Sequence, residues 1–389
     1  MRIQGKRRIK ERMDKKYKIL IATGGTGGHI YPAITLAHKY EKDGNRVIII
    51  GTGNEIEKKI FTSEDLEVKY FPSKLKDYPA YKKFLLSFWV DKEVKHFVRE
   101  MKPDMILGMG GYASSEICRA GGKDVCVIIQ EQNSIAGRVN RFLILFRKAR
   151  AAIQGLPGSF SKLDRLMMKS PDDMKFLGNP IRKEILDIKK ISPVEDKSGD
   201  LKVFIMGGSQ GARSINLIVP NALATLNRSI NIKVVHDTGD DDYEKVKESY
   251  RRLGIEAKVS KFNQNVESAY AWADLFIGRA GAMTVSELSA IGLPSILIPF
   301  PYAMDNHQFY NARFLEEKGG AVIIDDKNLT SEHLADVIKD LSEDRKILKK
   351  MSESAFDDRF VHATENIVDF TYQVIKKFKL MANHYHYRT

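Results

Sequence analysis

Short β-branched runs alternate with longer amphipathic stretches along the chain, and this order starts afresh near the middle. Such runs predict strands, and a strand, a helix and a second strand in succession form a parallel βαβ unit. In the first half, strands are expected over residues 17–23, 46–52, 104–109 and 125–129, with a helix between the first two. In the second half, strands are expected over residues 201–206, 230–236, 274–277 and 295–300, with a helix over 213–226. The pattern predicts an α/β protein of two doubly wound, Rossmann-like domains.

Length and composition agree with this division and exclude several protein classes. With 389 residues, 43% of them hydrophobic and 29% charged, the chain is long enough for two globular domains. Its longest strongly apolar run, Phe84 to Val90, is far shorter than the roughly 20 residues of a transmembrane helix. Only two cysteines are present, Cys118 and Cys126, which excludes a disulfide framework and favours a reducing cytoplasm.

The net charge of +13 is unevenly distributed. Residues 1–18 carry nine Lys or Arg against two acids, and no apolar core of a signal peptide follows them. Basic residues exceed acidic ones by eight over residues 19–185, whereas acidic residues are in excess by six over 186–375. A protein that binds nucleic acid with its whole surface would not show this asymmetry. We therefore expect one half to meet an anionic surface or substrate, and no nucleic acid as a partner.

The first glycine-rich loop, residues 24–29, departs from the dinucleotide-binding fingerprint. The third glycine of that fingerprint falls on Ile30, and Gly51-Thr52-Gly53 stands where its acidic residue is expected, which disfavours NAD. Small residues still let backbone N–H groups and a helix N-terminus approach a phosphate. The alternatives are a tight turn without a ligand and, for His29 at the loop end, a packing or capping residue instead of a base.

A second glycine-rich loop, residues 207–212, opens the second domain and adds the hydroxyl of Ser209. Two such loops, one in each domain, suit a pair of ligands that both carry phosphates, although two tight turns without a ligand remain the alternative. No His/Cys cluster has zinc spacing, and the acids at 240–242 are expected to lie at the start of a helix. No metal is therefore expected.

The stretch 278–287 follows a strand and opens a helix, and its composition suits a diphosphate. The first helical turn offers free N–H groups, Arg279 is a cation, and Thr284 and Ser286 carry hydroxyls. Glu287 is suited to accept hydrogen bonds from a ribose diol, with a favourable acid near a helix start as the alternative. Asp305–Gln308 is expected at the carboxyl end of a strand, where ligands bind in open sheets.

Several motifs occur together in one order along the chain. They are Gly24-Gly25-Thr26-Gly27-Gly28-His29 with Pro32, Gly110-Gly111-Tyr112, Glu131-Gln132-Asn133, Gly178-Asn179-Pro180 with Arg182, residues 207–212, residues 279–287, and Gln308 with Asn311-Ala312. Each is weak alone, but the ordered set is specific. Over roughly residues 17–375 the chain resembles the bacterial MurG family of glycosyltransferases.

The resemblance implies the GT-B architecture, in which two Rossmann-like domains face each other across a cleft. The chain is expected to begin with a basic leader, residues 1–16, which lies outside the family pattern. An N-terminal acceptor domain is expected over residues 17–185 and a UDP-GlcNAc domain over residues 186–360. The family architecture implies that the C-terminal helix, at about 361–380, returns to the N-terminal domain. The resemblance also implies an inverting, metal-independent transfer of GlcNAc from UDP-GlcNAc to the C4 hydroxyl of MurNAc in undecaprenyl-diphospho-MurNAc-pentapeptide, without a cofactor. This is the step from lipid I to lipid II.

Functional residues follow from the matching motifs. Donor contacts are expected at Thr26, Gly27, Gly28, Asn133, Arg182, Ser209, Asn263, Arg279, Ala282, Met283, Thr284, Val285, Ser286, Glu287 and Gln308. The acceptor diphosphate is expected at Gly24, Gly25, Gly110, Gly111 and Tyr112. Inversion needs a base for the acceptor hydroxyl, for which His29 is the first candidate and Glu131 the second.

The chain departs from the family pattern at two positions. Asn263 stands where the family usually places an aliphatic residue against the uracil, and Gln130 replaces the histidine that usually precedes Glu131. One alternative function is another GT-B transferase that acts on a glycolipid with a UDP-sugar. A second is a non-catalytic α/β protein that binds a membrane surface or nucleic acid.

Two stretches combine apolar side chains with lysines in the manner of an interfacial segment. The first is Tyr78–Trp89, preceded by Lys74 and Lys76, and the second is Phe142–Lys148. Together with the basic first half, they predict peripheral docking on the anionic cytoplasmic face of the membrane. The alternative for both is a core helix with solvated lysines. Other cell-wall synthesis proteins are further candidate partners.

Overall fold

The computed structural model describes residues 17–24, 27–72, 90–168, 170–188, 200–208, 210–226 and 230–386. Two compact units share the chain. Unit 1 runs to Ile181 and resumes at His362, and unit 2 spans Arg182–Val361. The sequence predicted the first division at 185/186, whereas the structure assigns Arg182 and the short helix α9 (Lys183–Leu186) to unit 2, where α9 packs against two other helices of that unit.

Unit 1 is built on a seven-stranded parallel sheet of the order β3-β2-β1-β4-β5-β6-β7 within the described residues. Its strands are β1 (Lys18–Ala22), β2 (Arg46–Gly51), β3 (Val68–Tyr70), β4 (Met105–Gly108), β5 (Cys126–Glu131), β6 (Ala151–Gln154) and β7 (Met174–Phe176). Its helices are α2 (Gly27–Lys42), α3 (Glu55–Phe61), α5 (Lys92–Met101), α6 (Gly111–Ala120), α7 (Arg138–Leu145), α8 (Lys162–Met167), the 3₁₀ turn η1 (Pro171–Asp173) and α18 (Ala363–His386).

In its described part, unit 2 repeats the arrangement with a six-stranded parallel sheet of the order β10-β9-β8-β11-β12-β13. Its strands are β8 (Leu201–Met206), β9 (Ile232–Asp237), β10 (Glu256–Ser260), β11 (Leu275–Gly278), β12 (Ser295–Leu297) and β13 (Ala321–Ile323). Besides α9, its helices are α10 (Arg213–Leu226), α11 (Tyr243–Leu253), α12 (Val266–Trp272), α13 (Ala282–Ile291), η2 (Met304–Asn306), α14 (His307–Glu317), η3 (Asp326–Asn328), α15 (Ser331–Ser342), α16 (Arg345–Ala355) and α17 (Asp358–Val361).

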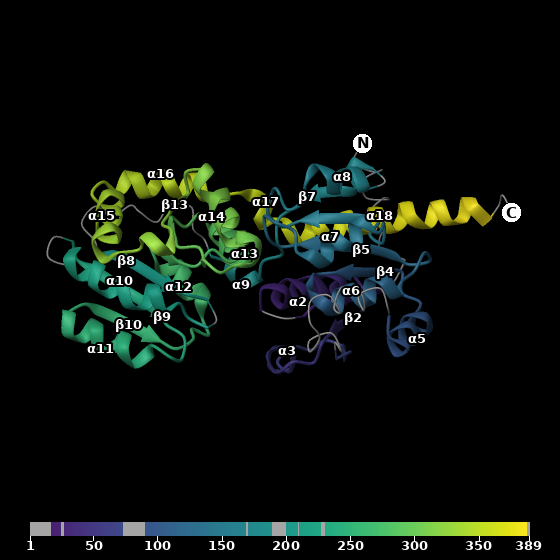
Figure 1. Cartoon of the computed structure of the whole chain (residues 1–389), viewed down its shortest axis with the longest axis horizontal. Coiled ribbons are helices and arrows are strands. Elements are labelled where there is room, and N and C mark those ends of the chain that lie inside the picture. Colours follow the sequence, from purple (N-terminus) through teal and green to yellow (C-terminus); the bar gives the residue numbers. More distant parts are fainter. Residues whose placement is uncertain are drawn as a thin grey trace. The chain divides into compact units, whose positions relative to one another are not determined.

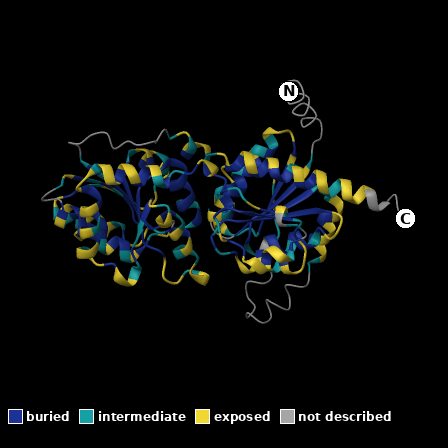
Figure 2. Cartoon of the chain, turned by 90° about the horizontal axis from the view of Figure 1, so that it is seen from above, coloured by how far each residue is buried: buried dark blue, intermediate teal, exposed yellow. Residues whose placement is uncertain are grey.

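Both sheets are buried between helices, which is why their central strands are apolar along nearly their whole length. Figure 2 shows the strands of each unit as buried and the outer faces of the surrounding helices as exposed. All eight strands expected from the sequence are confirmed, with bounds that differ by up to three residues at an end. The strands that the sequence pattern did not predict, β3, β6, β7, β10 and β13, lie at or next to sheet edges, where the apolar signal is short or weak.

The last long helix, α18, belongs to unit 1 although it follows unit 2 in the chain (Figure 1). Its buried side chains, among them Ile367, Val368 and Ile375, extend one apolar core of that unit. The buried hydroxyl of Tyr40 on α2 lies 2.7 Å from that of Thr371 on α18. Burying each such aliphatic side chain contributes about 1.5–3 kcal/mol, so the helix is a structural part of unit 1.

In each sheet the order of strands reverses at one position, between β1 and β4 in unit 1 and between β8 and β11 in unit 2. At such a reversal the helices that follow the two strands leave on opposite faces. The loops therefore diverge and open a crevice at the carboxyl ends of the strands, where α/β proteins bind ligands. The glycine-rich loops found in the sequence lie at these two places.

Candidate active site

At the reversal in unit 1, the loops after β1 and β4 touch each other. A Cβ atom on Gly111 would lie 3.0 Å from the carbonyl oxygen of Gly24, and Gly111 has a positive φ of 79°. A glycine is therefore required there for both space and backbone conformation. Of the predicted set, Gly24 lies against Gly111, and Gly110 lies against the ring of His29, which follows Gly27 and Gly28 on the first turn of α2. Gly25, Thr26 and the side chain of Tyr112 lie outside the part that the structure describes.

His29, on the first turn of α2, is held by an amide from another strand end. Its Nδ1 lies 2.8 Å from Oε1 of Gln132, and Nε2 of Gln132 donates to the carbonyl oxygen of Met109 at 3.1 Å. A backbone carbonyl only accepts hydrogen bonds, so the amide NH₂ must face Met109 and its oxygen must face the imidazole. Neutral His29 therefore carries its proton on Nδ1. Its Nε2 is left as an unprotonated acceptor, which is the form that a general base needs.

Glu131, the second candidate base, is an internal anchor of the loop that follows β5. Only 3% of the residue is exposed. Oε1 accepts from the backbone and side-chain N–H groups of Asn133 at 3.1 and 3.2 Å. Oε2 accepts from the backbone N–H of Gly137 at 2.8 Å and from Nδ2 of Asn140 at 2.9 Å. Four donors thus converge on this carboxylate, an arrangement that fixes the loop and shields the group from a substrate.

Gln130 and Asn179 form a second buried support for the same loop. Nε2 of Gln130 donates to Oδ1 of Asn179 at 3.2 Å, and Nδ2 of Asn179 donates to the carbonyl oxygen of Gln132 at 3.0 Å. Both side chains are fully buried. The glutamine that replaces the expected histidine therefore acts inside the fold, where it helps to hold Gln132 in place.

At the reversal in unit 2, the glycine-rich loop after β8 is closely packed. A Cβ atom on Gly207 would lie 2.3 Å from the backbone nitrogen of Ala212, and one on Gly211 would lie 2.0 Å from the carbonyl oxygen of Thr238. Gly208, with a φ of 92°, has open space around its Cβ position. Two of the three glycines are therefore required by the packing of the fold itself. Ser209 lies outside the described residues.

The helix α13 starts beside this loop with an uncapped N-terminus. Its N-cap residue, Gly281, contributes no side-chain hydrogen bond. The first-turn N–H groups of a helix lack intrahelical partners, and they carry the positive end of the helix dipole. An anion such as a diphosphate is stabilised at such a position.

Glu287 lies one to two turns further along α13, buried at 8% exposure. Its Oε2 accepts a hydrogen bond from the hydroxyl of Tyr270 at 3.1 Å, and its Oε1 lies 3.8 Å from Nη2 of Arg182. Burial raises the pKa of Glu287, while Arg182 and Tyr270 act in the opposite direction. The carboxylate therefore has one oxygen near a cation and one on a phenol. This leaves acceptor capacity for a hydroxyl pair.

Gln308, at the start of α14, has its amide orientation fixed in the same manner as Gln132. Its Oε1 accepts from the backbone N–H of Phe300 at 3.0 Å. Because that N–H group only donates, the NH₂ group of Gln308 points away from it. The residue thus presents hydrogen-bond donors at the carboxyl end of β12.

Comparison with known proteins decides the family of the chain. The models of the glycosyltransferase family 28 N-terminal and C-terminal domains match residues 19–152 and 202–367. A Coxiella burnetii protein named UDP-N-acetylglucosamine--N-acetylmuramyl-(pentapeptide) pyrophosphoryl-undecaprenol N-acetylglucosamine transferase is 38% identical over 87% of this chain and 93% of its own. A Francisella philomiragia protein of the same name is 36% identical, over 93% of this chain and 99% of its own.

A solved structure supports the same family. Acinetobacter baumannii MurG matches with a TM-score of 0.74 at 27% identity, and the match covers 93% of this chain and 100% of that one. The chain belongs to the MurG family of glycosyltransferases. The GT-B architecture expected from the sequence, with two Rossmann-like α/β domains, is confirmed.

Within this MurG-family fold, several expected donor contacts have other partners. The hydroxyl of Ser286 is fully buried and donates to the carbonyl oxygen of Ala282 at 2.8 Å, so it is not presented to a diphosphate. Val285 is fully buried as well. Arg279 donates to the carbonyl oxygens of Ile298 and Pro299 and is ion-paired with Asp326. Near the helix start, Met283 and Thr284 remain partly exposed.

Asn263 uses its side chain locally. Its Oδ1 accepts from the backbone N–H of Asn265 at 3.0 Å, just before α12, and the neighbouring Phe262 is 61% exposed. Reasoning from the sequence also missed Gln132, Tyr270 and Asp326 as partners of predicted site residues. Gln132 could have been found from the sequence, because it lies inside the motif Glu131-Gln132-Asn133. Tyr270 and Asp326 have no local signal, since each meets its partner only through the folding of unit 2.

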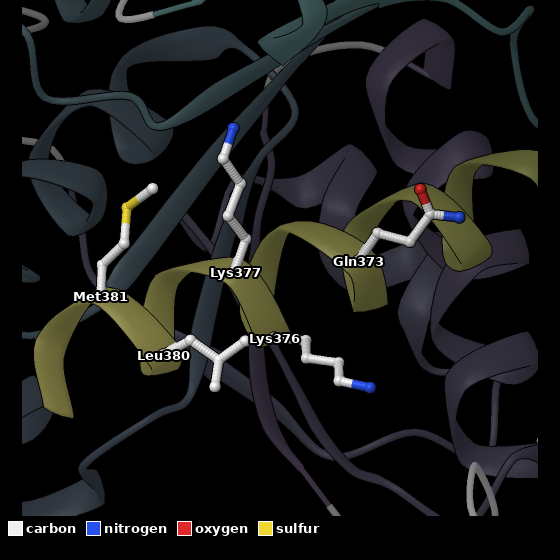
Figure 3. A pocket seen from close by; sticks show the side chains of 5 residues that line it. All are labelled: Gln373, Lys376, Lys377, Leu380 and Met381. Carbon is white, nitrogen blue, oxygen red and sulfur yellow. The ribbon is translucent and has the colours of Figure 1, made fainter. Parts of the chain in front are cut away.

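No group of His, Cys, Asp and Glu in the described ranges forms a metal-ion site. Figure 3 shows a shallow depression on α18 that contains none of the predicted site residues. Its lining residues all belong to that helix and are Gln373, Lys376, Lys377, Leu380 and Met381. Lys377 is ion-paired with Asp173 at 3.0 Å, which ties this part of α18 to the rest of unit 1.

Proposed function

We propose that this protein transfers GlcNAc from UDP-GlcNAc to the C4 hydroxyl of MurNAc in undecaprenyl-diphospho-MurNAc-pentapeptide, which converts lipid I to lipid II. The observation that carries this proposal is the 38% identity, over 87% of the chain, with a relative whose name states this transfer. The geometry of the two strand-order reversals is consistent with it. In each unit, a helix starts at the carboxyl end of a central strand, beside glycines, where an anionic group would be stabilised.

The donor is assigned to unit 2. The N-terminus of α13 faces the diphosphate, Glu287 accepts hydrogen bonds from the ribose hydroxyls, and the NH₂ group of Gln308 donates to the sugar. Because the helix dipole favours negative charge at its N-terminus, it also stabilises the UDP leaving group as the glycosidic bond breaks. The reaction then needs no metal ion for this charge.

The acceptor is assigned to unit 1, with its diphosphate at the loops of Gly24 and Gly110-Gly111. Nε2 of His29 removes the proton of the C4 hydroxyl as the oxygen attacks the anomeric carbon. The bond from that carbon to the diphosphate breaks on the opposite face, so the configuration inverts. Gln132 keeps the proton of neutral His29 on Nδ1, which leaves Nε2 available for the step.

We place the protein peripherally on the cytoplasmic face of the membrane through unit 1. The described helices include none that is long and apolar enough to span a bilayer. The predicted segment Phe142–Lys148 covers the end of α7 and the residues after it, and only part of it is exposed. Leu143 and Ile144 are core residues, whereas Leu145 and Phe146 are 56% and 42% exposed and the next two residues are basic. On the adjacent α8, Leu163 and Leu166 are also exposed. The other predicted segment, Tyr78–Trp89, lies outside the described residues.

Exposed apolar side chains beside basic ones suit an anionic membrane surface. A variant with Leu145, Phe146, Leu163 and Leu166 replaced by serine should bind anionic liposomes more weakly than the parent in co-sedimentation. Replacement of Leu217 in unit 2, which is 47% exposed, is the matched control and should change nothing. Equal binding of the folded variant and the parent would mean that another surface docks.

The function is tested by the release of UDP from UDP-GlcNAc in the presence of a lipid I analogue. We expect release only with this acceptor, together with a disaccharide product. Release with a different glycolipid instead would favour another GT-B transferase. Binding of either ligand without any release would favour a non-catalytic protein.

A further inference from the structure

Arg279 joins the carboxyl ends of several strands in unit 2. It follows β11, and its Nη1 donates to the carbonyl oxygens of Ile298 and Pro299, beyond β12, at 3.1 and 3.2 Å. Its Nη2 donates to the hydroxyl of Ser214, on the first turn of α10, at 3.0 Å. Its charge is paired with Asp326, which begins η3 after β13.

Two partners of Arg279, Ser214 and Asp326, also contact each other. The hydroxyl of Ser214 donates to Oδ2 of Asp326 at 2.8 Å, the same oxygen that pairs with Arg279. The side chains of Arg279 and Asp326 are only 11% and 17% exposed. In such a setting, solvent screens the pair weakly and a planar guanidinium holds several acceptors in one geometry.

We propose that Arg279 is a positioning residue of the donor site and does not act as the cation that binds the diphosphate. It holds the start of α10, the loop before α13 and the segment after β12 in one arrangement, and these segments surround the strand-order reversal of unit 2. The carboxylate of Asp326 neutralises its charge, so the attraction left for a diphosphate is small. The N–H groups at the start of α13 then supply the phosphate contacts. This inference rests on the proposed function, because it presupposes that unit 2 binds a UDP-sugar.

Two roles of Arg279 predict opposite effects of removing Asp326. If Arg279 bound the diphosphate directly, Asp326→Asn would unmask its charge and leave UDP binding unchanged or tighter. If Arg279 positions the loops, Asp326→Asn disrupts the same network as Arg279→Gln. Both variants should then weaken UDP binding by about tenfold, the scale of a lost charge-assisted hydrogen bond. The double variant should be no weaker than the worse single variant, because both residues act as one unit.

Arg279→Lys separates the roles a second time. Lysine keeps the positive charge but lacks the planar fork that reaches Ser214 and two carbonyl oxygens. Positioning predicts UDP binding as weak as in Arg279→Gln, whereas a direct phosphate contact predicts substantial rescue. The KM for the donor should rise in every variant of this network while the KM for the lipid I analogue stays unchanged.

A matched control lies at the other end of the same strand. Asp274 immediately precedes β11, and its carboxylate is 3.6 Å from Arg345, with both side chains similarly buried at 13% and 17% exposure. Asp274→Asn should lower thermal stability without weakening UDP binding.

The measurement is titration calorimetry with UDP on the full chain, with thermal unfolding of each variant alongside. The proposal is overturned if folded Asp326→Asn binds UDP as tightly as the parent, or if Arg279→Lys restores binding. Should Asp326→Asn fail to fold, Ser214→Ala takes its place, with the same weakening expected and parent-like affinity overturning the proposal. A parent protein that does not bind UDP at all would instead overturn the proposed function.

Discussion

Replacement of Glu131 by glutamine separates a structural carboxylate from a catalytic one. Glutamate accepts four hydrogen bonds at this position, two on each oxygen. Glutamine has one oxygen, and its NH₂ group would face the donors on the other side. Asn140 accepts from that NH₂ group through its unpartnered Oδ1 only if its amide turns, and the turn breaks the hydrogen bond from its Nδ2 to the carbonyl oxygen of Gln130. The backbone N–H of Gly137 cannot turn, so one buried donor is left unpaired.

The expected loss of stability follows from this count. An unpaired buried donor costs about 1–3 kcal/mol, and the loss of the charge on the remaining hydrogen bonds adds about 1 kcal/mol. We therefore expect Glu131→Gln to destabilise unit 1 by about 2–4 kcal/mol. For a domain of this size that corresponds to a decrease in Tm of roughly 10 °C.

The decisive comparison is activity per folded molecule, measured in single turnovers well below the lowered Tm. If Glu131 is structural, the rate of Glu131→Gln should stay within about tenfold of the parent. If Glu131 were the general base, its removal would lower the rate by about 10²–10⁴. His29→Ala is the converse control, with the rate lowered by that factor and a small change in Tm, since the residue is only half-buried. A Glu131→Gln protein with an unchanged Tm and a reaction slower by about a thousandfold would refute the structural role and make Glu131 the base.

Three further predictions concern protonation and the donor. Gln132→Glu places a carboxylate against Nδ1 of His29, so the acidic limb of the rate–pH profile should move to higher pH; an unmoved limb would argue against His29 as the base. Glu287→Gln should weaken UDP binding by about 1–2 kcal/mol in calorimetry with little loss of Tm, because burial already disfavours the charged carboxylate; equal affinity would remove Glu287 from the donor site. Burial lowers the pKa of His236 from 6.5 to about 3. The stability that neutral His236 contributes is therefore complete above pH 6.5 and is lost as the pH falls, by about 2 kcal/mol at pH 5. Urea unfolding of His236→Gln should lack this part of the pH dependence.

The sequence by itself determined the class of fold and the location of the sites. Strand and helix positions depend on local composition and periodicity, and the glycine-rich loops mark strand ends that parallel sheets bring to one edge. Two α/β domains, the eight strands and the family could therefore be predicted from the order of residues. The strands near the sheet edges could not, because they are short and three of them, β3, β7 and β10, have a lysine among their few apolar residues.

Only the tertiary structure decided which polar groups remain available for a ligand. The charge of Arg279 is taken up by Asp326, 47 residues away, and the proton of His29 is placed by Gln132, 103 residues away. The carboxylate of Glu131 is occupied by its own loop, which a motif does not reveal. A residue type states what a side chain can donate or accept, whereas its partners depend on strand order and loop packing. Each polar group makes a limited number of hydrogen bonds, so the bonds that it makes within the fold reduce what it can offer to a substrate.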